Sequence, residues 1–126
     1  MKKALIFGIS GQDGTLLADF LLKKGYEIYG TSRDIELNEF KGLIFLNIKN
    51  QIKLCSLTLT DYKSVLQVIE EISPDEIYNL AGETSVAKSF QNPIKTTESI
   101  VNGTFNILEA LKVLNLNIKF FNASSS

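Results

Sequence analysis

The sequence predicts a doubly wound parallel α/β fold, in which helices cover both faces of one sheet. Two observations support this prediction: a short apolar strand leads directly into a helix, and strands then keep alternating with helices along the chain. A length of 126 residues corresponds to one domain. We therefore expect a single sheet of about five main strands.

The first part of the chain predicts a strand, a helix and a second strand. The apolar segment "KKALIFG" (residues 2–8) is typical of a strand that is buried on both faces, which places it centrally in a parallel sheet. From Asp13 to Lys24 the apolar residues have helical spacing, and Gly25 follows where a C-terminal cap belongs. The segment "YEIYGTSR" (26–33) predicts the second strand, reached by a right-handed crossover.

The middle of the chain is less regular. "LIFLNI" (43–48) and "IKLCSL" (52–57) each predict a strand, and the sequence leaves open which of them pairs in the main sheet. "DYKSVLQVIEEIS" (61–73) predicts a helix with Asp61 as its N-cap. The remaining elements are a strand in "DEIYNLAG" (75–82), a helix in "TESIVNGTFNILEALKVLN" (97–115) and a strand in "IKFFNAS" (118–124).

The composition favours small-molecule partners. A net charge of -1 lacks the basic excess that nucleic-acid or anionic-membrane binding needs. Cys55 is the only cysteine and there is no histidine, so an internal disulfide, a Ser-His-Asp or Cys-His nucleophile and the usual zinc sites are excluded. No apolar run suits a membrane span or a signal peptide. We expect a cytoplasmic protein without metal, membrane or nucleic-acid partners.

Three glycines form a G-x-x-G-x-x-G turn between the first strand and the first helix. Gly8 would allow the tight turn, Gly11 would let backbone N–H groups approach a pyrophosphate, and Gly14 would let the helix pack closely on the sheet. The helix N-terminus adds partial positive charge. Although this spacing also occurs in purely structural turns, the strand before it and the helix after it favour a dinucleotide site.

The end of the second strand bears on which dinucleotide binds. An acid at this point selects the ribose hydroxyl of NAD, whereas an arginine accommodates the 2′-phosphate of NADP. Arg33 and Asp34 indicate opposite answers. We favour Arg33 and NADP, because Asp34 comes one residue later and can already belong to the loop; the alternative is that Arg33 is a solvated surface charge.

Several segments resemble, in order and spacing, the N-terminal part of the GDP-mannose 4,6-dehydratases, which are extended short-chain dehydrogenase/reductases. They are "GISGQDGTLLADFLLKKGYEIYGTSR" (8–33), "PDEIYNLAGETSVAKSFQNP" (74–93), "GTFNILEALKVL" (103–114) and "FFNASSS" (120–126). The resemblance implies that residues 1–126 are the N-terminal part of an NADP-binding Rossmann-type domain. It also implies that the sheet is truncated after about its fifth main strand, and that the rest of the catalytic domain and the substrate domain are absent.

The resemblance also implies roles for individual residues. Ser125 matches the active-site Ser/Thr that hydrogen-bonds the sugar 4-oxygen. Glu83 and Ser85 are substrate-side candidates, although a local hydrogen-bonding role for Glu83 stays open. The implied cofactor-binding residues are Gly8, Gly11, Gln12, Asp13, Gly14, Arg33, Leu80 and Ala81.

The sequence departs from the family pattern at positions that bear on the substrate. Thr58 stands where members usually carry an acid that meets the adenine amine. Gly82 and Glu83 replace Ala-Gln, and Ser85 replaces a histidine found in many dehydratases. These differences leave the sugar open among dehydratases, epimerases and 4-keto-sugar reductases.

The resemblance implies that the full-length protein is a lyase that converts GDP-mannose to GDP-4-keto-6-deoxymannose with NADP. It also implies that the full-length protein is a homo-oligomer. The alternatives are another extended-family epimerase or reductase, and a non-catalytic nucleotide-binding module. Family catalysis needs a tyrosine followed four residues later by a lysine, which lowers the pKa of the tyrosine. No such pair occurs among Tyr26, Tyr29, Tyr62 and Tyr78, so we expect this chain alone to be an inactive fragment.

Overall fold

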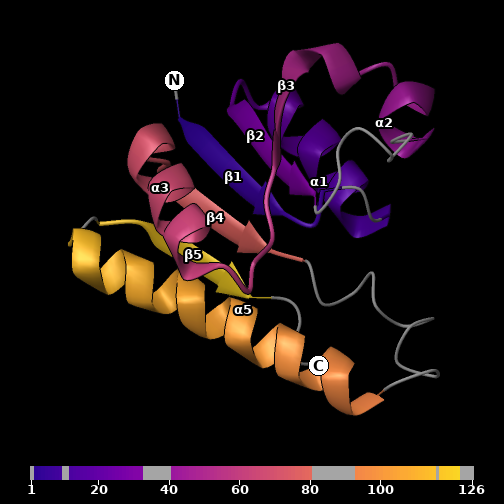
Figure 1. Cartoon of the computed structure of the whole chain (residues 1–126). Helices are drawn as coiled ribbons and strands as arrows, with labels where there is room; N and C mark the ends of the chain where they lie inside the picture. The colour runs from indigo at the N-terminus through magenta and orange to yellow at the C-terminus, as the bar shows by residue number, and fades with distance from the viewer. Residues whose placement is uncertain (1, 10–11, 33–40, 81–92, 116, 123–126) are drawn as a thin grey trace.

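The computed structural model describes residues 2–9, 12–32, 41–80, 93–115 and 117–122 (Figure 1). Its five strands form one sheet in the order β3-β2-β1-β4-β5, and each neighbouring pair is parallel. This confirms the predicted α/β class and the central place of the first strand, and it is the order of a Rossmann-like sheet. The elements are β1 (Lys3–Phe7), α1 (Gln12–Lys23), β2 (Glu27–Ser32), α2 (Lys41–Phe45), the 3-10 turn η1 (Lys49–Gln51), β3 (Ile52–Ser56), α3 (Tyr62–Ile72), β4 (Glu76–Asn79), α5 (Pro93–Leu114) and β5 (Lys119–Asn122).

Strand β1 separates two hydrophobic cores. Its residues Ala4 and Ile6 belong to a core that α1 and α2 cover, whereas Leu5 and Phe7 belong to a core that α3 and α5 cover. Successive side chains of a strand point to opposite faces, and all four are fully buried. The helix pairs lie on opposite sides of the sheet in Figure 1, as the doubly wound arrangement requires.

Helix α1 ends in the glycine cap that the sequence predicts. Gly25 has a φ of 89°, its N–H donates to the Leu22 carbonyl at 3.0 Å, and the Tyr26 N–H donates to the Leu21 carbonyl at 3.1 Å. This pair of bonds defines a Schellman motif, and glycine adopts the left-handed backbone at least cost. The cap turns the chain directly into β2.

The strand predicted over residues 43–48 is wrong. Helix α2 occupies Lys41–Phe45, and the chain then turns through Asn47, whose φ is 59°. Leu43 and Ile48 are buried while Phe45 is 86% exposed, so this short apolar segment does not lie inside the sheet. The other candidate, residues 52–57, supplies β3, which pairs with β2.

One predicted helix start is confirmed and another needs correction. Asp61 is the N-cap residue of α3, as predicted, and its carboxylate accepts a hydrogen bond from the Ser64 hydroxyl at 2.8 Å in place of a backbone cap bond. Helix α5 begins at Pro93, four residues before the predicted start, and proline is favoured in the first turn of a helix.

None of the helices in the described part of the chain has the length and hydrophobicity of a membrane-spanning segment.

Two acids, the exposed Asp75 and the buried Glu76, make hydrogen bonds near the amino ends of the strands. Asp75 accepts from the Lys3 N–H through Oδ2 at 2.8 Å, and its own N–H donates to the Lys3 carbonyl at 2.9 Å. The neighbouring Glu76 carboxylate is only 7% exposed and accepts hydrogen bonds from the hydroxyls of Tyr26, at 2.8 Å, and Tyr78, at 2.5 Å. Tyr78 also stacks on Phe121 of β5, with ring centroids 4.8 Å apart.

These contacts make the charge of Glu76 important for stability. Burial raises the pKa of Glu76, but the hydrogen bonds from Tyr78 and Tyr26, with the charges of Lys2 and Lys119, outweigh it and lower the pKa below its ordinary value. A carboxylate with a lowered pKa in the folded state stabilises the fold above its unfolded pKa, about 4.3. That contribution is lost as the pH falls through the lowered folded pKa.

We predict that Glu76→Gln lowers the free energy of unfolding at pH 7 by about 1.5–3 kcal/mol, because the charge is removed and one of the two acceptor oxygens is replaced by an NH2 donor. The deficit relative to wild type should shrink below about pH 4.3, where wild type itself loses the charge. Urea unfolding followed by circular dichroism across pH 3–7 measures both effects. Glu70→Gln, at an exposed position of α3, is the control; an equal loss in both variants, or a pH-independent one, contradicts the prediction.

Candidate functional site

The candidate site lies at the carboxyl ends of β1 and β4. From β1 the chain continues to β2 and β3 on one side of the sheet, and it later builds β4 and β5 on the other side. Open α/β sheets bind ligands at such a switch point, beyond the carboxyl ends of the strands. The Leu80 N–H donates to the Phe7 carbonyl at 2.9 Å, so the β1–β4 pairing extends one residue beyond β4.

The turn after β1 bends toward β2. Gly8 has a φ of 84°, a conformation that favours glycine. The N–H groups of Gly8 and Ile9 both donate to the Thr31 carbonyl, at 3.2 and 3.3 Å. The tight turn predicted at Gly8 is therefore present, and backbone hydrogen bonds to β2 hold it.

The first turn of α1 packs directly on this segment. A Cβ added to Gly14 would lie 2.8 Å from the Gly8 carbonyl oxygen and 2.8 Å from Ile9 Cα, so only glycine fits. This agrees with the close packing predicted for Gly14. The first N–H groups of a helix have no partner within it and carry partial positive charge. The described backbone therefore fits the pyrophosphate of a dinucleotide.

Two further glycines, which lie outside the G-x-x-G-x-x-G motif, allow close packing around the turn after β1 and the first turn of α1. Gly30 of β2 leaves the space that the buried Ile9 side chain fills, since an added Cβ would lie 2.4 Å from Ile9 Cδ1. Gly42 of α2 lies against Thr15 of α1, where an added Cβ would be 2.9 Å from Oγ1. A glycine inside a strand pattern often marks close approach, so Gly30 carried a usable signal.

A polar contact connects β4 to α5 near the same edge. Asn79 is 2% exposed, and its Nδ2 donates to Thr104 Oγ1 at 3.2 Å. On the neighbouring side, Cys55 lies near the carboxyl end of β3. Burial, and to a smaller extent the charge of Glu71, raises the pKa of the Cys55 thiol, so it is protonated near neutral pH and unsuited to act as a nucleophile.

The structure places only part of the predicted site. Gly8, Gly14 and Leu80 lie around the carboxyl ends of β1 and β4. Gln12 and Asp13 begin α1, and only their backbone is described. The remaining predicted residues lie outside the described residues, and their roles stay predictions: Gly11, Arg33, Ala81, Glu83, Ser85 and Ser125.

The strand order and the glycine-supported turn define a Rossmann-like α/β domain. The chain belongs to the GDP-mannose 4,6 dehydratase family, whose model matches residues 5–126.

Curated relatives agree with this assignment. A GDP-mannose 4,6-dehydratase of Vibrio cholerae is 38% identical over 132 residues, which cover 99% of this chain and 36% of that protein. A GDP-mannose 4,6 dehydratase of Cricetulus griseus is 38% identical over 133 residues, which cover 99% of this chain and 36% of that protein. The chain thus spans about a third of the length of these relatives.

Solved structures share the fold. The UDP-Glc/GlcNAc 4-epimerase of Campylobacter jejuni has a TM-score of 0.79 at 25% identity, covering 97% of this chain and 36% of that one. The WbmH enzyme of Bordetella bronchiseptica, solved with NAD+, has a TM-score of 0.70 at 25% identity, covering 92% of this chain and 36% of that one. The dTDP-glucose 4,6-dehydratase of Bacillus anthracis has a TM-score of 0.75 at 18% identity, covering 97% of this chain and 37% of that one. At this low identity the similarity shows only a shared fold.

We predict that Gly14→Ala lowers the free energy of unfolding by about 1–3 kcal/mol, because its methyl group would overlap backbone atoms that cannot move independently. In an ordinary helix the same change is stabilising by about 0.5–1 kcal/mol, so the sign of the effect is diagnostic. Urea unfolding measures it. Leu16→Ala, at a 55% exposed position of the same helix, should change stability by no more than about 0.5 kcal/mol. A Gly14→Ala variant as stable as wild type would refute the packing argument.

Proposed function

We propose that the chain is the N-terminal, cofactor-binding part of an NADP-dependent sugar-nucleotide 4,6-dehydratase that converts GDP-mannose to GDP-4-keto-6-deoxymannose. The observation that carries the proposal is the family match over residues 5–126. The glycine-supported turn at the switch point of the sheet adds physical support, because it suits a pyrophosphate. The NAD+ bound to the similar WbmH enzyme supports a nicotinamide dinucleotide.

The proposed pyrophosphate site combines the turn with the start of α1. Gly8 bends the chain, Gly14 lets the helix approach the turn, and Gly11 is proposed to let backbone N–H groups reach the phosphates. Gln12 and Asp13 complete the proposed cofactor-binding turn. A bound nicotinamide cofactor supplies the means to accept a hydride from the sugar and return it.

The end of β2 is the proposed 2′-phosphate site. The Ser32 carbonyl accepts a hydrogen bond from the Leu57 N–H at 3.0 Å, which fixes the strand immediately before Arg33. A guanidinium binds a phosphate through two parallel hydrogen bonds and stays charged at any physiological pH. We assign the NADP preference to Arg33 on this basis.

The sugar end of the site is proposed from the family match. Leu80 and Ala81 would lie beside the adenosine ribose and the nicotinamide, Ser125 would hydrogen-bond the sugar 4-oxygen, and Glu83 and Ser85 would contact the GDP-sugar. The sequence contains no tyrosine followed four residues later by lysine. Since this pair provides the base in the proposed reaction, we expect these residues to bind the cofactor without turnover.

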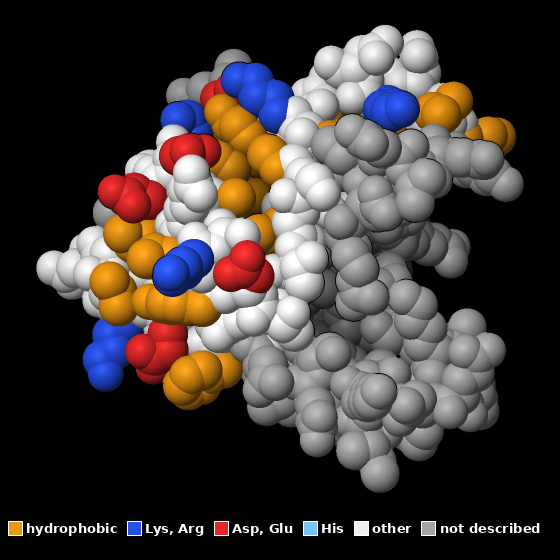
Figure 2. All heavy atoms as spheres, in the orientation of Figure 1, with side chains coloured by type: hydrophobic (Ala, Val, Ile, Leu, Met, Phe, Trp, Pro, Cys, Tyr) orange, Lys and Arg blue, Asp and Glu red, His pale blue; other side chains and the backbone are white. Residues whose placement is uncertain are grey.

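The exposed surface is compatible with a homo-oligomer. Phe105, Leu108 and Val113 of α5 are 60%, 48% and 60% exposed. Figure 2 shows hydrophobic side chains at the surface on the α3 and α5 side, interspersed with charged ones. Exposed apolar area of this kind is common at protein–protein interfaces, which supports the proposed association of the full-length protein.

We predict that the wild-type chain binds NADP+ more tightly than NAD+ and that Arg33→Ala weakens NADP+ binding by about 10- to 100-fold. The lost charge-assisted hydrogen bonds to the 2′-phosphate are worth about 1.5–3 kcal/mol. NAD+ lacks this phosphate, so its affinity should be unchanged. Isothermal titration calorimetry with both nucleotides measures the effect.

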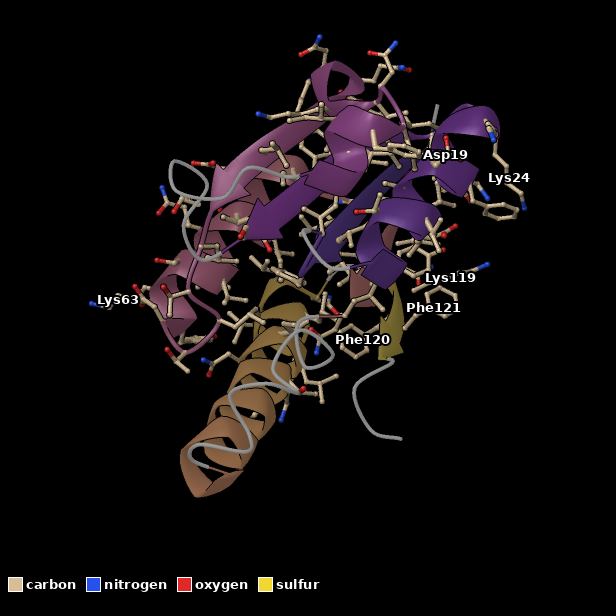
Figure 3. The ribbon with its side chains drawn as sticks, turned by 90° about the vertical axis from the view of Figure 1, so that its right-hand side faces the viewer. Asp19, Lys24, Lys63, Lys119, Phe120 and Phe121 are labelled. Carbon is tan, nitrogen blue, oxygen red and sulfur yellow. The ribbon has the colours of Figure 1, made fainter. Side chains whose placement is uncertain are left out.

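Lys63→Ala is the matched control for this experiment. Lys63 is an exposed cation on α3, and its side chain points away from the sheet in Figure 3. Its removal changes the net charge by the same amount and should leave both affinities unchanged. Wild type that binds neither nucleotide would refute the proposed function. Equal weakening of NADP+ and NAD+ by Arg33→Ala would refute only the role of Arg33.

A further inference from the structure

Ile9 is the residue at which β1, β2 and α1 meet. It follows Gly8 immediately after β1, its N–H donates to the Thr31 carbonyl beyond the middle of β2, and its backbone touches Gly14 in the first turn of α1. The Thr15 hydroxyl completes the connection with a long hydrogen bond of 3.5 Å to the Ile9 carbonyl. The Ile9 side chain is fully buried in the core beneath α1.

Gly30 provides the space for this side chain. A Cβ at Gly30 would lie 2.4 Å from Ile9 Cδ1, 2.7 Å from Cγ2 and 3.0 Å from Cβ. Real carbon atoms do not approach so closely, so residue 30 cannot carry any side chain while Ile9 keeps its position. The three distances also rank the atoms of Ile9: Cδ1 is the main obstacle, Cγ2 the second, and Cβ needs only a small shift.

We propose that Ile9 is a positioning residue for dinucleotide binding, and that the bare backbone of Gly30 is what allows it to hold the phosphate-binding turn against α1. This inference rests on the proposed function. Ile9 itself is fully buried, so its side chain is not exposed to a ligand. It acts by fixing the backbone on which the neighbouring N–H groups are carried, and hydrogen bonds to phosphate depend steeply on direction.

The test is a double-mutant cycle on the whole chain, with NADP+ as the titrant and thermal unfolding recorded in parallel. Ile9→Ala should weaken NADP+ binding by about tenfold or more, equivalent to about 1.4 kcal/mol. Ile9→Val keeps Cβ and Cγ2 and should bind within about threefold of wild type. Gly30→Ala should weaken NADP+ binding strongly. The double variant Gly30→Ala/Ile9→Ala should bind NADP+ as tightly as Ile9→Ala alone, because alanine at position 9 lacks the two atoms that come closest to the new Cβ.

Ile28→Ala is the matched control. Ile28 is a fully buried isoleucine of β2 in the same core, but it pairs with Ala4 near the amino end of the sheet. It should lower the unfolding temperature about as much as Ile9→Ala while leaving the NADP+ affinity of the folded protein within about twofold. A purely structural role for Ile9 would instead make the two variants alike in both measurements.

The outcomes separate the inference from the proposed function. If wild type binds NADP+ and Ile9→Ala binds as tightly, or if Ile28→Ala weakens binding equally, the inference is overturned and the proposed function stands. If wild type binds neither NADP+ nor NAD+, both fall. If Ile9→Ala does not fold, the double variant Gly30→Ala/Ile9→Val replaces it in the test. This variant should bind NADP+ more tightly than Gly30→Ala, because valine at position 9 lacks the Cδ1 atom that clashes most; equal or weaker binding overturns the inference.

Discussion

The parallel pairing of β1 on both of its edges is the constraint on which the rest of the structure depends. A strand whose side chains are fully buried on both faces must satisfy its backbone groups through neighbouring strands. The pairing continues past the strand: the Gly8 and Ile9 N–H groups bond to Thr31, and the Leu80 N–H bonds to Phe7. The hydrogen bonds that build the core thus also fix the backbone of the candidate site.

The two ends of the sheet are held by different chemistry. At the amino end, paired side chains dominate: Glu76 accepts from two tyrosines, and Lys53 bonds to Glu27 at 2.8 Å. At the carboxyl end, the Asn79–Thr104 hydrogen bond is joined by close approaches, of Gly14 to the backbone of Gly8 and Ile9 and of Gly30 to the Ile9 side chain. Ion pairs and hydrogen bonds of charged side chains tolerate small shifts of their partners, whereas atoms already in close steric contact do not. The end proposed to bind the cofactor is therefore the more sterically determined one.

The sequence predicted most of the fold because its signals were local. The apolar spacing of α1, the cap at Gly25 and the strand periodicity each depend on neighbouring residues, and the structure confirms them. The apolar segment 43–48 was predicted wrongly because a short run of this kind suits a strand or a buried helix equally well. The contacts of Ile9 with Gly30 and of Thr15 with Gly42 join separate elements, so the spacing of the motif could not reveal them.

These contacts explain why a glycine spacing alone is weak evidence for a phosphate site. Gly8 and Gly14 allow the turn and the helix to approach each other, and the Gly8 N–H group also bonds to Thr31 of β2. The contact of Ile9 with Gly30, which lies in another element and outside the motif, adds a side-chain constraint to these hydrogen bonds. A relative with a side chain at the position of Gly30 would need a smaller residue than isoleucine after its first glycine. The geometry of the turn thus depends on Ile9 and Gly30 together, and the glycine motif does not include Gly30.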